Sequence, residues 1–341
     1  MFERPEAGES AIVVHVVFKD FGRSPDLDEF LELVTSAGAT TIETVTATRD
    51  RPDPRYFIGT GKADTLKALV RDSHADVVLV NNNLTPAQER NLEGLLECRV
   101  IDRTRLILDI FAQRARSFEG KLQVELAQLK HLSTRLVRGW THLERQKGGI
   151  GLRGPGETQL ESDRRMLGLR IKQINERLSR VRTQRQQSAR SRRRALLSTV
   201  SIVGYTNAGK STLFNHLTGS EVFAANRLFA TLDTTLRRFD VTGEHPALLS
   251  DTVGFIRDLP PELIAAFQAT LEETADASLL LHVVDSSSPE ANDNIAEVHR
   301  VLDRLGARDT PMVEVFNKID LRPDIAPHVE RGPEGQVTRV W

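Results

Sequence analysis

The sequence predicts an α/β protein built in three parts. Strand-like and helix-like segments alternate over residues 1–118, which favours a parallel sheet covered by helices. Residues 119–196 carry two long runs of apolar residues spaced by threes and fours, which indicates an antiparallel pair of long helices. From residue 197 a strand-like segment runs into a glycine-rich loop and a helix, which predicts a second α/β domain over 197–341, doubly wound and mostly parallel.

The composition is that of a globular protein, with 27% charged and 39% hydrophobic residues. The longest apolar runs, such as 11–18 and 278–284, are far shorter than the roughly 20 residues that cross a bilayer. The first ten residues lack the apolar core of a signal peptide, and a single cysteine, Cys98, excludes an internal disulfide. We therefore expect a cytoplasmic protein without a membrane span.

In the N-terminal domain the first strand is expected at 11–18. The segment SPDLDEFLELVTSAG (24–38) then predicts a helix with Ser24 as its N-cap and Pro25 in its first turn. The later elements are expected in the order strand 39–49, helix 62–74, strand 75–82, helix 85–97 and strand 98–102.

The fragment GTGK at 59–62 resembles part of a phosphate-binding loop. It places Tyr56 where the first glycine belongs and Ala63 where a hydroxyl belongs. We interpret it as a turn that leads into a helix.

The helical region is predicted to be a hairpin with a glycine-rich tip. Its two apolar stripes are Leu122, Leu126, Leu129, Leu132, Leu136, Trp140 and Leu143, then Leu160, Leu167, Ile171, Ile174, Leu178 and Val181. Between them QKGGIGLRGPGETQ (146–159) contains five glycines and one proline, so neither helix is expected to continue through it. The loop is longer than a hairpin needs, although a plain connector is the alternative interpretation.

The net charge of −1 hides a strongly basic segment. Between 177 and 194 the chain has no acidic residue and eight arginines, at positions 177, 180, 182, 185, 190, 192, 193 and 194. Such a block creates a local positive field that can attract phosphates.

The segment GYTNAGKST (204–212) matches the phosphate-loop pattern G-x-x-x-x-G-K-[ST] in full, between a β-branched strand and a helix. Gly204 and Gly209 let the backbone curl around phosphate oxygens, and Lys210 reaches the β- and γ-phosphates. Ser211 offers its hydroxyl to Mg²⁺. The predicted phosphate-binding residues are Gly204, Tyr205, Thr206, Asn207, Ala208, Gly209, Lys210, Ser211 and Thr212.

Downstream, DTVGF (251–255) follows an apolar strand. Asp251 is expected to hold Mg²⁺ through water, and the Gly254 N–H to reach the γ-phosphate. Phe255 stands where Ras-like enzymes carry the glutamine that orients the attacking water.

The segment FNKID (316–320) specifies the base. The Asp320 carboxylate can accept hydrogen bonds from N1–H and the 2-amino group of guanine, and adenine presents neither donor. Asn317 is expected at the Hoogsteen edge of the purine, and the Lys318 stem over its face. Together the three motifs predict GTP as the substrate and Mg²⁺ as the cofactor.

A switch threonine that contacts Mg²⁺ and the γ-phosphate is expected in RLFATLDTTLRRFD (227–240). Thr231, Thr234 and Thr235 all qualify, and we favour Thr231, twenty residues beyond Ser211. The predicted metal ligands are Ser211, Thr231 and Asp251, and the predicted catalytic residues are Lys210, Gly254 and Thr231.

The segments GYTNAGKSTLFN, FATLDTT, DTVGFI and NKID resemble the GTPase domain of the HflX family. The upstream DRTRLILDIFAQRA (102–115) and GGIGLRGPGETQLE resemble its N-terminal half. The resemblance implies a cytoplasmic GTPase that binds the large ribosomal subunit and splits stalled or stress-inactivated ribosomes. Some members also show ATP-dependent RNA unwinding attributed to the N-terminal half.

With Phe255 in place of glutamine, intrinsic turnover is expected to be slow, and the ribosome is expected to supply the missing alignment. Contacts with rRNA are expected at Lys147, Gly149, Arg153, Gly154, Arg190, Arg192 and Arg193. The chain is expected to be a monomer.

The chain ends at VTRVW (337–341), before the S-A-[KL]-like segment that follows N-K-x-D in the family. We therefore expect an incomplete GTPase domain with weakened guanine affinity and a poorly held last strand. The alternatives are a GTPase for ribosome assembly or tRNA modification, a GTP-gated RNA-binding module with little hydrolysis, and an ATP-dependent RNA-remodelling enzyme.

Overall fold

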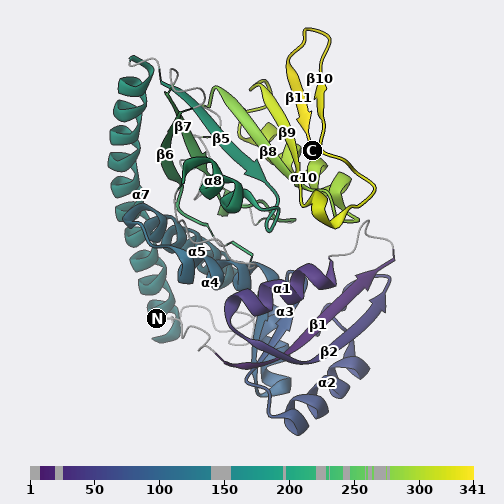
Figure 1. Ribbon diagram of the computed structural model, residues 1–341. Helices are drawn as coiled ribbons and strands as arrows, with labels where there is room; N and C mark the ends of the chain where they lie inside the picture. Colours follow the sequence, from purple (N-terminus) through teal and green to yellow (C-terminus); the bar gives the residue numbers. More distant parts are fainter. Residues whose placement is uncertain are drawn as a thin grey trace. The chain divides into compact units, whose positions relative to one another are not determined.

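The computed structural model describes residues 8–19, 26–139, 155–194, 197–219, 228–229, 231–240, 246–257, 259, 263–264, 274 and 277–341 (Figure 1). Within its helices, the side chains of 136–139, 155–160, 186 and 188–194 are not described. The chain forms two compact units, one of residues 1–113 and 124–177 and the other of residues 114–123 and 178–341.

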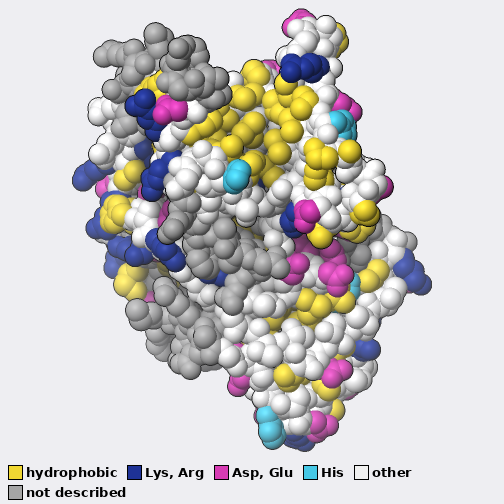
Figure 2. All heavy atoms as spheres, in the orientation of Figure 1, with side chains coloured by type: hydrophobic (Ala, Val, Ile, Leu, Met, Phe, Trp, Pro, Cys, Tyr) yellow, Lys and Arg dark blue, Asp and Glu magenta, His cyan; other side chains and the backbone are white. Residues whose placement is uncertain are grey.

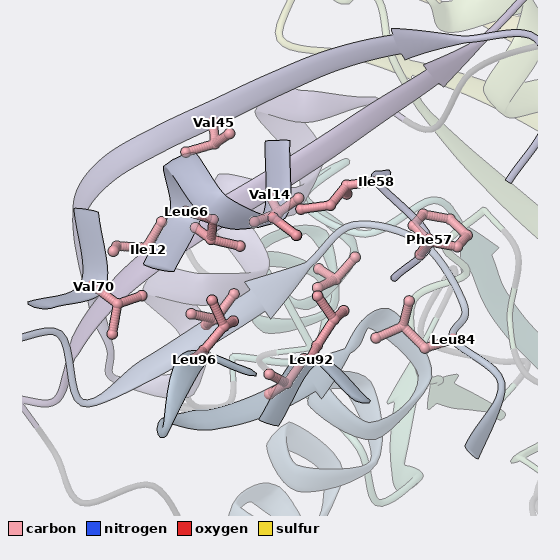
Figure 3. Packing of buried hydrophobic residues seen from close by; sticks show 14 of the residues in the cluster. Ile12, Val14, Val45, Phe57, Ile58, Leu66, Val70, Leu84, Leu92 and Leu96 are labelled. Carbon is pink, nitrogen blue, oxygen red and sulfur yellow. The ribbon is translucent and has the colours of Figure 1, made fainter. Parts of the chain in front are cut away.

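The first unit contains a four-stranded parallel sheet in the order β2-β1-β3-β4. Its elements are β1 (Ser10–Phe18), α1 (Leu27–Ala37), β2 (Thr40–Arg49), α2 (Thr60–Ser73), β3 (Val77–Val80), α3 (Pro86–Leu96), β4 (Arg99–Asp102) and α4 (Arg103–Arg114). Aliphatic side chains of the sheet pack against those of α2 and α3 (Figure 3). The predicted alternation of strand and helix is confirmed.

The predicted start of the first helix is wrong. The helix begins at Leu27, and Asp26 is its N-cap, because the Asp26 side chain accepts a hydrogen bond from the Asp28 N–H at 2.9 Å. Ser24 and Pro25 lie outside the described residues. Gly59, expected in a turn, is the N-cap of α2 with φ of 86°.

The long helices are α5 (Phe118–Gly139) and α7 (Pro155–Arg194). In the first unit Arg170 of α7 forms a salt bridge with Glu125 of α5, and in the second Arg185 forms one with Glu119. The glutamate that comes later in α5 pairs with the arginine that comes earlier in α7, so the two helices run antiparallel. Residues 146–154 of the predicted tip lie outside the described residues. The expectation that 155–159 is not helical is wrong, because α7 begins at Pro155. Proline is well suited to the first turn of a helix.

The second unit contains a seven-stranded sheet in the order β10-β11-β9-β8-β5-β7-β6, in which the outermost strands β10 and β6 are antiparallel to their neighbours. Its elements are β5 (Ser198–Gly204), α8 (Lys210–Thr218), β6 (Thr235–Asp240), β7 (Pro246–Asp251), β8 (Leu279–Asp285), α10 (Ala291–Arg304), β9 (Met312–Asn317), a 3₁₀ turn (Ile319–Leu321), β10 (Val329–Arg331) and β11 (Val337–Val340). This is the predicted doubly wound, mostly parallel arrangement.

The last strand is better supported than expected. It pairs with β9 on one side and β10 on the other, and the Trp341 ring stacks on Phe316 and on His328 with centroids 4.6 and 4.2 Å apart.

Exposed basic residues lie on α7 at Arg177, Arg180 and Arg182, and Figure 2 shows Lys and Arg side chains gathered along this flank. Among the helices that the structure describes, none combines the length and the apolar character needed to cross a membrane.

Candidate nucleotide site

The phosphate loop joins β5 to α8 at the carboxyl edge of the second sheet. Gly204 has φ of 149°, and a Cβ there would lie 2.3 Å from the Val283 carbonyl oxygen. Gly209 has φ of 96°, and a Cβ there would lie 2.1 Å from the Asn317 amide nitrogen. Both positions therefore require glycine, for conformation and for space.

Lys210, the first residue of α8, is buried inside this loop. Its ammonium donates a hydrogen bond to the Tyr205 carbonyl oxygen at 2.5 Å. Burial lowers the pKa of Lys210 to about 8, although the nearby Asp251 carboxylate raises it. A buried cation with so little compensation favours an anionic ligand.

Three oxygen-bearing side chains converge beside Lys210. The Ser211 hydroxyl lies 2.8 Å from the Thr231 hydroxyl and donates to Asp251 Oδ2 at 2.8 Å. The Thr231 hydroxyl donates to the same carboxylate oxygen at 3.0 Å. Of the three candidate switch threonines, Thr231 is the one in this cluster, and Thr235 lies in β6 opposite Asp251 in the strand pairing.

The Asp251 carboxylate lacks part of its expected bonding. Its Oδ1 is buried without a hydrogen-bond partner among the described residues. Burial raises the pKa of Asp251 despite the hydrogen bonds from Ser211 and Thr231. Hydroxyl and carboxylate oxygens are the ligands Mg²⁺ prefers, so these three residues fit that ion.

Phe255 is an anchor for the DTVGF turn. Its side chain is fully buried, its N–H donates to the Gly204 carbonyl at 3.1 Å, and its carbonyl accepts from the Thr206 N–H at 2.8 Å. The Arg257 N–H in turn donates to the Tyr205 hydroxyl at 2.9 Å. The turn is thus attached to the phosphate loop on both sides of Phe255, and the buried ring presents no polar group to orient water.

Gly254 lies against the phosphate loop. A Cβ at this position would approach Thr206 Cγ2 to 2.8 Å and Lys210 Nζ to 3.0 Å. The Gly254 backbone therefore lies next to the ammonium group that is expected to contact the phosphates.

The guanine motif follows β9. The Asn317 side-chain N–H donates to the Ala208 carbonyl at 2.9 Å, so this amide ties the motif to the phosphate loop. The expected place of Asn317 at the Hoogsteen edge of the purine stays a prediction. Lys318 has φ of 61°, and its ammonium forms a salt bridge with Asp285 Oδ2 at 2.7 Å. Asp320 is exposed in the following 3₁₀ turn.

Sequence reasoning missed two carboxylates. Asp285 ends β8 and holds Lys318, and its place at the carboxyl end of an apolar strand was a usable signal. Asp233 accepts hydrogen bonds from the Arg116 and Ser117 N–H groups at 2.9 and 2.8 Å. No local pattern reveals that contact, because its partners are more than one hundred residues away in the chain.

The predicted RNA contacts are not placed. Lys147, Gly149, Arg153 and Gly154 lie outside the described residues. Arg190, Arg192 and Arg193 belong to α7, but their side chains are not described.

Three family models match the chain in succession. Residues 24–112 match "GTP-binding GTPase N-terminal", residues 114–193 match "GTP-binding GTPase Middle Region", and residues 199–318 match "50S ribosome-binding GTPase".

Curated relatives match over most of their length. A protein of Escherichia coli strain K12 named GTPase HflX is 58% identical over 341 residues, which is 100% of this chain and 80% of the relative. A GTPase HflX of Caldanaerobacter subterraneus is 48% identical over 317 residues, covering 92% of this chain and 73% of the relative. The crystal structure of SsGBP in complex with GDP is similar with a TM-score of 0.53 and 27% identity, covering 92% of this chain and 83% of that one.

Proposed function

The chain belongs to the HflX family of GTPases, and from this premise we propose that it binds the large ribosomal subunit in the cytoplasm and splits stalled or stress-inactivated ribosomes under the control of GTP. The ribosome as partner is supported by the match of residues 199–318 to the 50S ribosome-binding GTPase model. The observation that carries the control by GTP is the contact of Asp233, two residues after Thr231, with the Arg116 and Ser117 N–H groups just before α5.

The site offers residues for both ends of GTP, the phosphates and the guanine base. Lys210 and the loop N–H groups would bind the β- and γ-phosphates, and Asp320 would accept the two guanine donors. Ser211, Thr231 and Asp251 would hold Mg²⁺, which when bound neutralises charge on the phosphates.

Hydrolysis in this site needs help from a partner. Phe255 is buried and carries no group that can align water, so turnover by the isolated chain is slow. We propose that the ribosome supplies the group that aligns the attacking water, so that GTP is hydrolysed mainly after the protein has bound the large subunit.

Asp233 connects the nucleotide to the helical arm, by which we mean α5 and α7. It lies two residues after Thr231, and its carboxylate accepts hydrogen bonds from the Arg116 N–H, the Ser117 N–H and the Ser117 hydroxyl. The Ser117 hydroxyl in turn accepts from the Gly120 N–H at 2.8 Å, so Asp233 holds the residue that caps α5. A Cβ at Gly120 would lie 2.2 Å from Asp233 Oδ1, so the fit leaves no space for a side chain. Release of Thr231 after hydrolysis would therefore loosen the hold of Asp233 on Ser117, the residue that caps α5.

The arm would supply the contact with RNA. Arg177, Arg180 and Arg182 are exposed on α7, and basic side chains attract rRNA phosphates. The glycine-rich tip, with Arg153, would enter a narrow RNA cavity.

Turnover and docking test the proposal together. We expect large subunits to stimulate GTP hydrolysis, and co-sedimentation to be strong with a GTP analogue and weak with GDP. Deletion of 148–156 should leave GTP binding intact and abolish splitting of ribosomes. Splitting by the deleted chain would overturn the role of the tip, and absence of any stimulation would favour a GTP-gated RNA-binding module.

Asp233→Ala tests the connection itself. Coupling between two sites typically amounts to about 1–3 kcal/mol, or about 5–150-fold in affinity. We expect the variant to bind GTP normally but to lose most of the difference in subunit affinity between GTP and GDP states. Asp240→Ala is the matched control, because Asp240 is an exposed carboxylate on β6 in a surface ion pair. An unchanged nucleotide dependence in Asp233→Ala would contradict the connection.

A further inference from the structure

Three potential metal ligands, none of them among the residues assigned to GTP, lie together on one face of the second sheet. His282 of β8, His299 of α10 and Glu314 of β9 each bring one ligand atom within 4.8 Å of the other two. His282 and Glu314 are opposite each other in the parallel pairing of β8 with β9, so their side chains share a face. His299 Nε2 lies 4.0 Å from Glu314 Oε1, and the imidazole rings meet edge to face with centroids 5.7 Å apart.

His282 has bonding capacity that the described residues leave unused. Its side chain is 1% exposed, and its Nδ1 is buried without a hydrogen-bond partner among them. An unsatisfied buried polar atom destabilises a fold by about 1–3 kcal/mol. Burial, with the charges of His299 and Lys210, lowers the pKa of His282 to about 3, so the ring is neutral at physiological pH.

Glu314 is oriented for a ligand by a neighbour. Arg339 Nε donates to Glu314 Oε2 at 2.7 Å, which leaves Oε1 on the side of His299. Carboxylates that bind metals are commonly held in this way by a hydrogen bond from outside the coordination sphere.

We propose that His282, His299 and Glu314 form a transition-metal site that prefers Zn²⁺, with water as the fourth ligand. Two imidazoles and one carboxylate are donors that zinc uses in proteins. Tetrahedral zinc with bonds of about 2.0–2.2 Å places its ligand atoms about 3.3–3.5 Å apart, so the cluster must contract by about 1 Å. The His299 side chain is 45% exposed, so the contraction would come from rotation of this ring toward His282 and Glu314.

The site would stabilise the guanine-binding end of the sheet. A bound ion would join α10 to β8 and β9, and these strands end at Asp285 and Asn317.

The test uses the full chain, stripped with a chelator and saturated with Mg²⁺ and GDP so that the cation position beside Ser211 is filled. Zn²⁺ is titrated against a chromophoric chelator, and Co²⁺ binding is followed by visible absorption. We expect one equivalent of Zn²⁺ and the intense absorption of four-coordinate Co²⁺. His299→Ala and Glu314→Gln should each weaken binding at least about tenfold.

Matched controls separate this site from others. His216→Ala removes an exposed imidazole on α8 and should leave Zn²⁺ affinity unchanged. GDP binding by each variant verifies that it is folded. Zn²⁺ affinity equal to wild type in His299→Ala and Glu314→Gln, a stoichiometry other than one, or a six-coordinate Co²⁺ spectrum would overturn the proposal.

Discussion

The parallel first sheet and the mostly parallel second sheet differ in how the polar groups at their carboxyl edges are satisfied. In the first sheet strand order reverses between β1 and β3, the position where α/β folds often bind ligands. There the Asn81 amide donates to His15 Nδ1 at 3.0 Å and to the Asp26 carbonyl at 2.9 Å, and it accepts from Arg103 at 3.0 Å. Arg103 also pairs with Glu29, so the chain's own side chains occupy this edge.

The corresponding edge of the second sheet carries the phosphate loop and the Asp251 carboxylate. Around β5 and β7, Asp251 Oδ1 and the Thr206 hydroxyl are buried without partners among the described residues, and Lys210 is a buried cation. The comparison teaches that sheet topology alone does not mark a binding site, because the strand order reverses at both edges while the buried cation Arg103 is paired with Glu29 and Lys210 donates to a backbone carbonyl.

The largest effect that we expect at the edge of the second sheet is that of Asp320→Asn on GTP affinity. Loss of the carboxylate removes the acceptor for two guanine donors, and we expect GTP affinity to fall by about 10⁴-fold. Because Asp320 is exposed, the thermal midpoint of the nucleotide-free chain should not change. Calorimetric titration with GTP and GDP measures the loss, and Asp324→Asn, a nearby exposed carboxylate, is the control. A loss below about tenfold would remove Asp320 from the base site.

Arg103→Ala, in the first sheet, should lower the stability of the fold and leave nucleotide affinity unchanged. It leaves Glu29 buried without its cation, and we expect the free energy of unfolding to fall by about 3–5 kcal/mol. Nucleotide affinity of the folded chain should be unchanged. The double variant Arg103→Met with Glu29→Leu should recover most of the loss, because it leaves no unpaired charge. A large fall in GDP affinity without loss of stability would contradict the contrast.

Much of the fold and of the nucleotide site could be predicted because these features depend on residues that lie close together in the sequence. The alternating strands and helices, the phosphate loop and the N-K-x-D segment each lie within a few dozen residues, and the family resemblance built on them is confirmed. The roles of Thr231 and Asp320 stay predictions.

The unpredicted features depend on contacts between distant segments. The Asn317 amide donates to the Ala208 carbonyl, which is 109 residues away, and Asp233 accepts from the Ser117 N–H, which is 116 residues away. Two helix starts were misplaced for a different reason, since Asp26 competes with Ser24 as a cap and Pro155 can begin a helix as readily as end one.

The buried ammonium of Lys210 predicts a pH dependence of nucleotide binding. Its pKa is lowered to about 8, so above this pH the empty site loses the proton that phosphate binding needs. GDP affinity should fall by about tenfold per pH unit above pH 8, with proton uptake on binding. Folding stability of the empty chain should rise between pH 8 and 10.5, because there the unfolded lysine binds more protons.

Calorimetry in buffers of different ionisation enthalpy measures that proton uptake, and denaturant titration of the empty chain measures the stability. A GDP affinity that stays level from pH 7 to pH 9.5 would show that Lys210 is fully charged in the empty loop.

Tyr205→Phe should give the smallest effect and the finest test of the nucleotide site. It removes the hydroxyl that accepts the Arg257 N–H, a hydrogen bond of about 0.5–1.5 kcal/mol, and so loosens the DTVGF turn. Because Gly254 in this turn would contact only the γ-phosphate, GTP-analogue affinity should fall about two- to tenfold while GDP affinity is retained. The chain has two tyrosines, and Tyr56→Phe makes the same change in the first unit as a control. An equal loss for both nucleotides would mean that the hydroxyl supports the phosphate loop as a whole rather than the turn that distinguishes GTP from GDP.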